Sequence, residues 1–207
     1  MQIATQGRRE SSPRHDLDRL SPSSVIEAEP ATQQDLAQLA AIAKREIPGV
    51  NASAELAQIL KADPESIFSF RRAGKLVGGI AFLFLNCSGH DALLLDNIDL
   101  KNPQRAYLAR SDESVAAIYV WALAGYGRAV MGLGSVAAHL RQSRFMEADY
   151  YAQPSTKDGR DLLIALGFRP IQSFQSDLWC YLRPWHCLQP IWPASNLSTG
   201  SATNARH

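Results

Sequence analysis

Two glycines one residue apart, Gly132 and Gly134, stand where a strand gives way to a helix, and this spacing can serve ligand chemistry. They lie in the segment GRAVMGLGSVAAHLRQ, directly after the apolar run AAIYVWALA. Glycine lets the backbone approach a ligand closely, and the first N–H groups of a helix lack partners within it, so the pattern is typical of a phosphate site. A tight turn with close helix packing explains two glycines equally well. The residues alone leave both interpretations open.

Cysteine and histidine spacing argues against metal chemistry. The three cysteines, Cys87, Cys180 and Cys187, are widely spaced and contain no C-x-x-C pair. This pattern disfavours a zinc site or a disulfide framework and favours a reducing compartment. Cys180, His186 and Cys187 are near one another in sequence, but their spacing is wrong and a fourth ligand is missing. We therefore expect no metal.

Apolar periodicity and turn residues predict the elements of the first half. A short strand is expected at VIEAE, followed by a helix over QQDLAQLAAIAKRE with Thr32 as its cap and a second helix at SAELAQILKAD with Ser53 as its cap. The segments SIFSFRR and LVGGIAFLFL flank the turn AGK and predict a β-hairpin around Gly74. Because the second arm is apolar on both faces, it is expected to be a central strand.

The second half predicts strands alternating with helices. The strands are expected at AAIYVWALA, ADYYAQPS, RPIQSF and SDLWCYLRP, and the helices at SVAAHLRQSRF and KDGRDLLIALGF. The segment HDALLLDNIDL fits either a strand or a short helix. Arg141 and Arg144 are interpreted as cations that complement the negative end of the first of these helices. The order of elements predicts a mixed α/β (α+β) architecture with a largely antiparallel sheet.

Composition limits the domain boundaries and the function classes. Residues 1–24 and 185–207 are rich in polar residues and proline, so we expect a disordered arm and a tail around one folded domain, 25–184. The chain has 21 basic and 20 acidic residues, so no long-range field favours sequence-independent nucleic-acid binding. No secretory signal is evident, and no apolar run reaches the length of a membrane span. These features predict a soluble cytoplasmic protein without membrane partners.

Four segments, in order, resemble the GCN5-related N-acetyltransferase (GNAT) family. VIEAEPATQQDLAQLAAIA is similar to the opening strand and helix of the family, and RRAGKLVGGIAFLFL to its hairpin. GRAVMGLGS resembles its acyl-CoA pyrophosphate loop, and DGRDLLIALGFRPI its terminal helix. The resemblance covers about Val25 to Arg183. It implies a mixed, mostly antiparallel sheet of about six to seven strands flanked by about four helices.

The resemblance also implies a function and a binding site. In the family the fourth strand splays from the fifth, and acetyl-CoA or another acyl-CoA lies between them as co-substrate. The implied activity is N-acyl transfer to an amine of a small molecule or a protein, with a strand N–H such as that of Leu123 stabilising the oxyanion. The residues implied to bind the cofactor are Trp121, Ala122, Leu123, Gly132, Leu133, Gly134, Ser135 and Thr156.

The sequence departs from the family pattern at residues of the loop and of the proton chemistry. Ala129 stands where an Arg or Gln is usual, Leu163 occupies the place of a tyrosine that protonates the leaving thiolate, and the fourth strand lacks the glutamate used as general base. Other residues of suitable type are Tyr150, Tyr151, His139, Asp96 and Asp99, although packing or capping explains each of them too. Tyr150 and Tyr151 alternate faces of a strand, and we select Tyr151 as the candidate catalytic residue.

These departures keep alternatives open. A catalytically degenerate GNAT-fold protein that serves as a binding or regulatory module would also lack the tyrosine and the glutamate. An acyltransferase that uses a longer acyl donor is a further alternative. The acceptor amine is not legible in the sequence, and a homodimer remains open because members of the fold often dimerise.

Overall fold

The computed structural model describes residues 25–47 and 52–181. The predicted arm, 1–24, and the predicted tail, 185–207, lie outside the described residues, as does the end of the predicted domain, 182–184. No helix among the described residues is long and apolar enough to cross a membrane.

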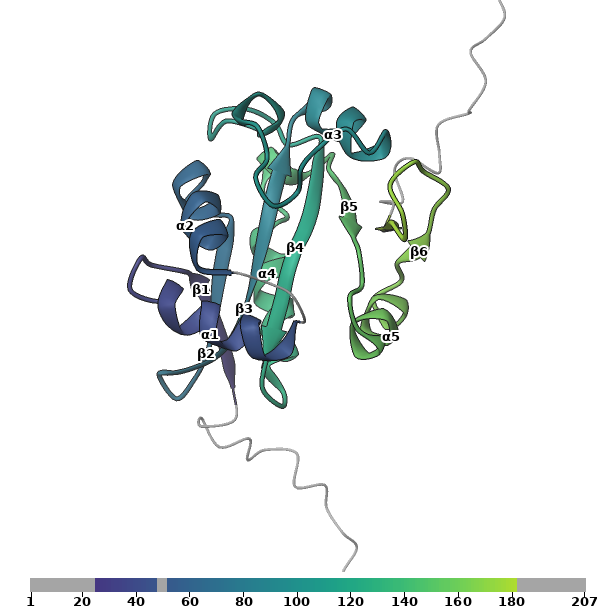
Figure 1. Cartoon of the computed structure of the whole chain (residues 1–207). Coiled ribbons are helices and arrows are strands. Elements are labelled where there is room, and N and C mark those ends of the chain that lie inside the picture. The colour runs from purple at the N-terminus through teal and green to yellow at the C-terminus, as the bar shows by residue number, and fades with distance from the viewer. Residues whose placement is uncertain (1–24, 48–51, 182–207) are drawn as a thin grey trace, which may run out of the picture.

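Seven strands form one mixed sheet in the order β1-β2-β3-β4-β5-β7-β6 (Figure 1). Neighbouring strands are antiparallel except β4 and β5, which are parallel. This arrangement confirms the predicted mixed and mostly antiparallel sheet. The strands are β1 Ile26–Pro30, β2 Ile67–Arg72, β3 Lys75–Leu85, β4 Ala117–Gly125, β5 Asp149–Ala152, β6 Arg169–Pro170 and β7 Trp179–Tyr181.

Five α-helices accompany the sheet within the described ranges, and short 3-10 helices join them. The α-helices are α1 Leu36–Glu46, α2 Ala52–Ala62, α3 Cys87–Leu94, α4 Leu133–His139 and α5 Lys157–Ala165. The 3-10 helices used below are η2 Arg105–Tyr107, η3 Ala129–Gly132 and η4 Ser143–Phe145. The first half of the segment HDALLLDNIDL, residues 90–94, lies in helix α3, and its second half is a loop.

The two predicted helix caps are wrong. Helix α1 begins after Asp35, and the N–H and hydroxyl of Thr32 both donate to the Asp35 carboxylate, at 2.9 and 3.0 Å. Thr32 thus holds a turn that precedes the helix instead of capping it. Ser53 is the second residue of α2, so it lies within the helix.

Apolar side chains fill both faces of the sheet, as the sequence of β3 predicts. One core packs α1, α2 and α3 on the sheet; its members include Leu39, Leu56, Leu83, Leu93 and Tyr151. The other core, on the opposite face, includes Phe68, Phe70, Phe82, Val136 and Phe145 and takes in α4. The hairpin turn has positive φ at Ala73 and Gly74, as two-residue hairpin turns require.

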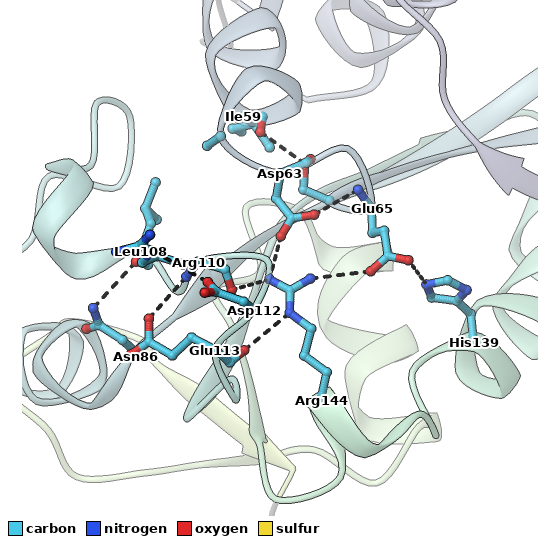
Figure 2. A network of polar contacts seen from close by, with 12 residues as sticks. Ile59, Asp63, Glu65, Asn86, Leu108, Arg110, Asp112, Glu113, His139 and Arg144 are labelled. Atoms are coloured by element: carbon cyan, nitrogen blue, oxygen red, sulfur yellow. Dashed lines mark hydrogen bonds and ion pairs between the residues drawn. The ribbon is translucent and has the colours of Figure 1, made fainter.

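Arg144 joins separate parts of the fold through a partly buried ion network (Figure 2). Its guanidinium contacts the carboxylate of Asp63 at 2.5 Å and that of Glu65 at 3.3 Å, and it donates to the carbonyl of Arg110 at 3.1 Å. Helix α4 ends at His139, before Arg144. The carboxylates therefore replace the helix end as the explanation for Arg144.

Candidate functional site at the fork between β4 and β5

The parallel pairing of β4 with β5 stops halfway along β4. The register runs from Ala117 opposite Asp149 to Val120 opposite Ala152. Beyond it β4 continues to Gly125 and stays paired with β3, but it has no strand partner on the β5 side among the described residues. The ribbons of the two strands diverge toward the end where α5 lies (Figure 1). We call this region, Val120–Gly125 together with Ala152, the β4–β5 fork.

Burial changes at the same point of the strand. Ala117, Ile118 and Tyr119 are buried, whereas every residue of Val120–Gly125 is partly exposed. An inner strand of a sheet is normally covered on both sides and reads as buried along its length. The residues of β4 at the fork are therefore partly exposed although the strand lies inside the sheet.

A β-bulge lies where the fork begins. Ala81 of β3 pairs with Ala122, but the next residue, Phe82, pairs with Val120, so Trp121 is an extra residue on β4. A bulge locally breaks the ladder and re-aims the groups of the bulged residue. The indole N–H of Trp121 donates to the carbonyl of Leu100 at 2.9 Å. The side chain thus has a structural partner, while its backbone lies at the fork.

The glycine loop after β4 is more helical than the sequence suggests. The 3-10 helix η3 runs directly into α4, and the N–H of Leu133 donates to the carbonyl of Val130. We expected the first N–H groups of the helix to have no partner within it. The N–H of Leu133 indeed has no partner within α4, but it is not free, because Val130 of the preceding 3-10 helix supplies its acceptor.

The surroundings of the two glycines in the loop differ, and they explain the choice of glycine at only one of the two positions. Gly132 is buried, and a Cβ there would lie 2.6 Å from the ring of Phe70, itself completely buried. Gly134 is exposed, does not have a positive φ, and a Cβ there would meet nothing within 4 Å. Packing therefore explains Gly132 and leaves Gly134 without a packing or conformational reason, at the open start of α4.

Close packing also explains one departure from the GNAT pattern. A Cβ on Gly125 would lie 2.5 Å from the Cβ of Ala129, and one on Gly78 would lie 3.1 Å from it. Ala129 is buried in this contact between η3 and the sheet, whereas Arg128 is exposed. A long Arg or Gln side chain has no room at position 129 in this arrangement.

Tyr151 lies beside the fork in a polar cluster that the sequence did not reveal. Its hydroxyl is 2.8 Å from Nε2 of His90 on α3, and it pairs across the strands with Cys180 on β7. Burial raises the pKa of Tyr151 well above its ordinary value, and Cys180 and Asp149 add to the rise. Burial and then Asp149 raise the pKa of the Cys180 thiol to about 12. A lone histidine in HDALLLDN carries no motif, so only the fold identifies His90.

The remaining candidate residues have structural partners. Thr156 caps α5 by accepting the N–H of Gly159 at 3.0 Å, and Leu163 packs with Ala152 and Trp179. His139 lies on the opposite face of the sheet, with its ring against Phe68.

The two acidic candidates lie in the loop after α3. Asp99 accepts a backbone N–H of its own loop from Lys101 at 3.0 Å, which is the capping role weighed for it above. Asp96 is exposed and has a positive φ of 56°. No hydrogen bond or ion pair joins Asp96 or Asp99 to Tyr151 among the described residues.

One surface hollow lies away from the fork. It encloses about 400 Å³ and is lined by Asn86, Arg105, Ala106, Leu108, Arg110 and Glu113. None of the predicted site residues lines it. Among the described residues, no three His, Cys, Asp or Glu side chains are grouped so that they could hold a metal ion.

Comparisons with known proteins give a likeness of fold. No family model and no curated protein matches the chain. The structure of Arabidopsis thaliana NAA60 in complex with acetyl-CoA is 15% identical, covers 77% of this chain and 100% of its own, and gives a TM-score of 0.52. PH1933 from Pyrococcus horikoshii is 12% identical, covers 77% of this chain and 99% of its own, and gives a TM-score of 0.50. A GNAT family acetyltransferase from Brucella melitensis in complex with acetyl-CoA is 13% identical, covers 82% and 92%, and gives a TM-score of 0.45.

Proposed function

Because the chain has the fold of the GCN5-related N-acetyltransferases, we propose that its β4–β5 fork binds acetyl-CoA or another acyl-CoA and transfers the acyl group to an amine. The amine belongs to a small molecule or a protein and attacks directly in a ternary complex. The observation that carries this proposal is the combination of an edge of β4 that has no strand partner among residues 25–47 and 52–181 and the exposed Gly134 at the start of α4, the next helix along the chain.

The backbone supplies the proposed binding groups. Trp121, Ala122 and Leu123 follow the last β4–β5 pair, so their backbone is available to the amide-bearing arm of the acyl-CoA. The loop Gly132–Ser135 spans the end of the 3-10 helix η3 and the start of α4. At the start of a helix the dipole favours an anion such as a pyrophosphate. Thr156 uses its oxygen to cap α5, and its hydroxyl hydrogen can donate to the arm.

Positioning accounts for most of the proposed catalysis. Holding an amine and a thioester in line can supply about 7–11 kcal/mol of the barrier, and a strand N–H such as that of Leu123 stabilises the oxyanion. A thiol titrates near a pKa of about 8.5, so a thiolate leaves without obligatory protonation. Leu163 in place of the family tyrosine is compatible with transfer for this reason. Tyr151 is the proposed catalytic residue that accepts the proton of the attacking amine.

Binding is tested first, by the thermal midpoint with acetyl-CoA, longer acyl-CoAs and desulfo-CoA. Ligand at 100 times its dissociation constant should stabilise the wild type by about 2.7 kcal/mol, or about 5–10 °C. Gly134→Asp should abolish the shift because its carboxylate repels the pyrophosphate. Ala138→Asp is the matched control, since it adds the same charge at an exposed position further along α4. No shift with any acyl-CoA in the wild type would refute the proposal.

Transfer is tested next, by release of free CoA thiol in the presence of amines. A chain that binds acetyl-CoA and transfers to no amine would be the binding or regulatory module, which Leu163 in place of the family tyrosine favours. Faster transfer from longer acyl-CoAs would identify a different donor. These outcomes separate the proposed activity from its two alternatives.

A further inference from the structure

Three side chains from three elements meet at Tyr151. His90 of α3 contributes Nε2 at 2.8 Å, and its ring centroid lies 5.2 Å from that of the tyrosine. Cys180 of β7 lies directly opposite Tyr151 in the antiparallel register and adds to the rise in the pKa of the phenol. Tyr151 and Cys180 are each only 3% exposed, whereas His90 is half-buried. His90 is therefore the member of the cluster that reaches toward solvent.

The protonation states give the hydrogen bond between Tyr151 and His90 a direction. A thiol with a pKa of about 12 keeps its proton at neutral pH, so Cys180 places no negative charge beside the phenol. The phenol also keeps its proton, because burial raises its pKa, and it has one O–H to give. That O–H donates to Nε2 of His90 when the imidazole proton is on Nδ1. The phenol thus donates toward His90, and its oxygen lone pairs can accept from another donor.

The cluster lies next to the place where the strands part. Tyr151 is opposite Tyr119 in the parallel register, and the last pair, Val120 with Ala152, follows at once. Tyr151 and Tyr119 belong to the same core, and the bulged Trp121 packs against that core. The phenol is thus on the face of the sheet covered by α3, one residue away from the fork.

We propose that Tyr151 and His90 form a relay that removes the proton of the attacking amine from the β4–β5 fork. This inference rests on the proposed acyl transfer. The amine nitrogen bonds to the thioester carbon, and the C–S bond breaks with its electron pair left on sulfur. The amine proton passes to the phenol oxygen while the phenol proton passes to Nε2 of His90. The imidazolium then loses its proton to water, and the phenol is neutral again.

Burial of the tyrosine suits a relay, although it would exclude a base. A phenol that receives one proton while it gives another never carries a negative charge, so a low-dielectric site does not oppose the step. The charged and titratable groups around the phenol are His90, Cys180 and Asp149. The buried carboxylate of Asp149 disfavours a phenolate and favours a positive charge nearby, as an imidazolium would supply. His90 acts through Tyr151 and is a positioning and proton-accepting residue.

The test compares the wild type with His90→Gln and Tyr151→Phe. The control is His139→Gln, which changes a histidine on the other face of the sheet. Each protein is first checked for a thermal shift with acetyl-CoA. Then kcat and KM are measured from about pH 5 to 9 with a panel of primary amines: a peptide with a free N-terminus, lysine and spermidine.

The relay predicts a specific pattern. Wild-type kcat should fall with falling pH across the range of about 5 to 8 where imidazoles titrate, because protonated His90 cannot accept. His90→Gln and Tyr151→Phe should each lower kcat by about 10²-fold, remove that limb and leave KM for acetyl-CoA within about twofold. The double variant should be no slower than either single variant. A further variant, His90→Ala, leaves space for free imidazole at the lost side chain. Added imidazole should restore turnover to His90→Ala but not to Tyr151→Phe.

Two results would overturn the relay. One is His90→Gln with the wild-type kcat and pH limb, and the other is Tyr151→Phe with the wild-type kcat. A wild type without an acetyl-CoA shift, or one that binds acetyl-CoA and transfers to no amine of the panel, would instead refute the acyl transfer on which the relay rests. The wild-type measurements therefore distinguish failure of the proposed function from failure of the relay, which the variants test.

Discussion

Alanine at each glycine of the GLGS loop should have opposite effects on stability. At Gly134 the new methyl group meets nothing within 4 Å, and the residue is in α4. Alanine is favoured over glycine in a helix by up to about 1 kcal/mol. We therefore expect Gly134→Ala to unfold at the wild-type temperature or up to about 3 °C above it, at roughly 3 °C per kcal/mol for a chain of this size.

At Gly132 the same methyl group has no space. It would lie 2.6, 2.9 and 2.9 Å from three ring atoms of Phe70, which is fully buried and cannot swing into solvent. Overpacking of this kind costs about 1–3 kcal/mol. Gly132→Ala should therefore unfold about 3–9 °C below the wild type.

The assay is thermal unfolding followed by intrinsic fluorescence, repeated with acetyl-CoA. Gly134→Ala should lose most of its ligand-induced shift although the free protein is no less stable, because the methyl group stands at the open start of α4. Gly132→Ala should keep the shift wherever it remains folded. Destabilisation of free Gly134→Ala would contradict our account of the loop, and so would a Gly132→Ala protein as stable as the wild type.

Two further predictions concern ion pairs. Asp63→Ala should destabilise the protein by about 3 kcal/mol in urea unfolding, because it leaves the nearly buried Arg144 without its closest carboxylate; a loss below about 1 kcal/mol would show that the network does not hold the fold. Burial opposes ionisation of Asp35, but hydrogen bonds from Thr32 and the charge of Arg71 prevail and lower its pKa below 3.8. The carboxylate thus contributes stability above that pH, so Asp35→Asn should cost about 1.5 kcal/mol at pH 7, and the difference should vanish as the pH falls below the lowered pKa. A difference that persists in acid would mean that shape and not charge matters at this position.

Local sequence patterns account for most of the elements. The turn at Gly74 and the long apolar run after it predict the hairpin of β2 and β3, because positive φ and two-sided burial leave direct traces in residue choice. The same holds for the apolar run that forms β4 and for the segment KDGRDLLIALGF, most of which forms α5. The GNAT resemblance combined such local patterns into a mixed, mostly antiparallel sheet of about six to seven strands, which the structure confirms.

Local patterns failed where a partner distant in sequence decides. Thr32 is a residue type that often caps helices, but here it donates to the carboxylate of Asp35 in the turn that precedes α1. Arg71, 36 residues further along the chain, binds the same Asp35 carboxylate at 2.6 Å. Arg144 has the position of a helix-end cation, yet its partners lie some 80 residues away in the chain. In both cases the competing partner comes from a segment that sequence spacing cannot place.

The sequence by itself determined where the backbone turns, which faces are apolar and which residues are small near the loop, because these depend on neighbours within a few positions. Tertiary structure alone decided that Gly132 faces Phe70 while Gly134 faces open space, and that β5 leaves β4 beside the bulge at Trp121. It also brought His90 to Tyr151, 61 residues away in the chain. Such meetings depend on how whole elements pack, and packing is a property of surfaces that form only when the chain has folded.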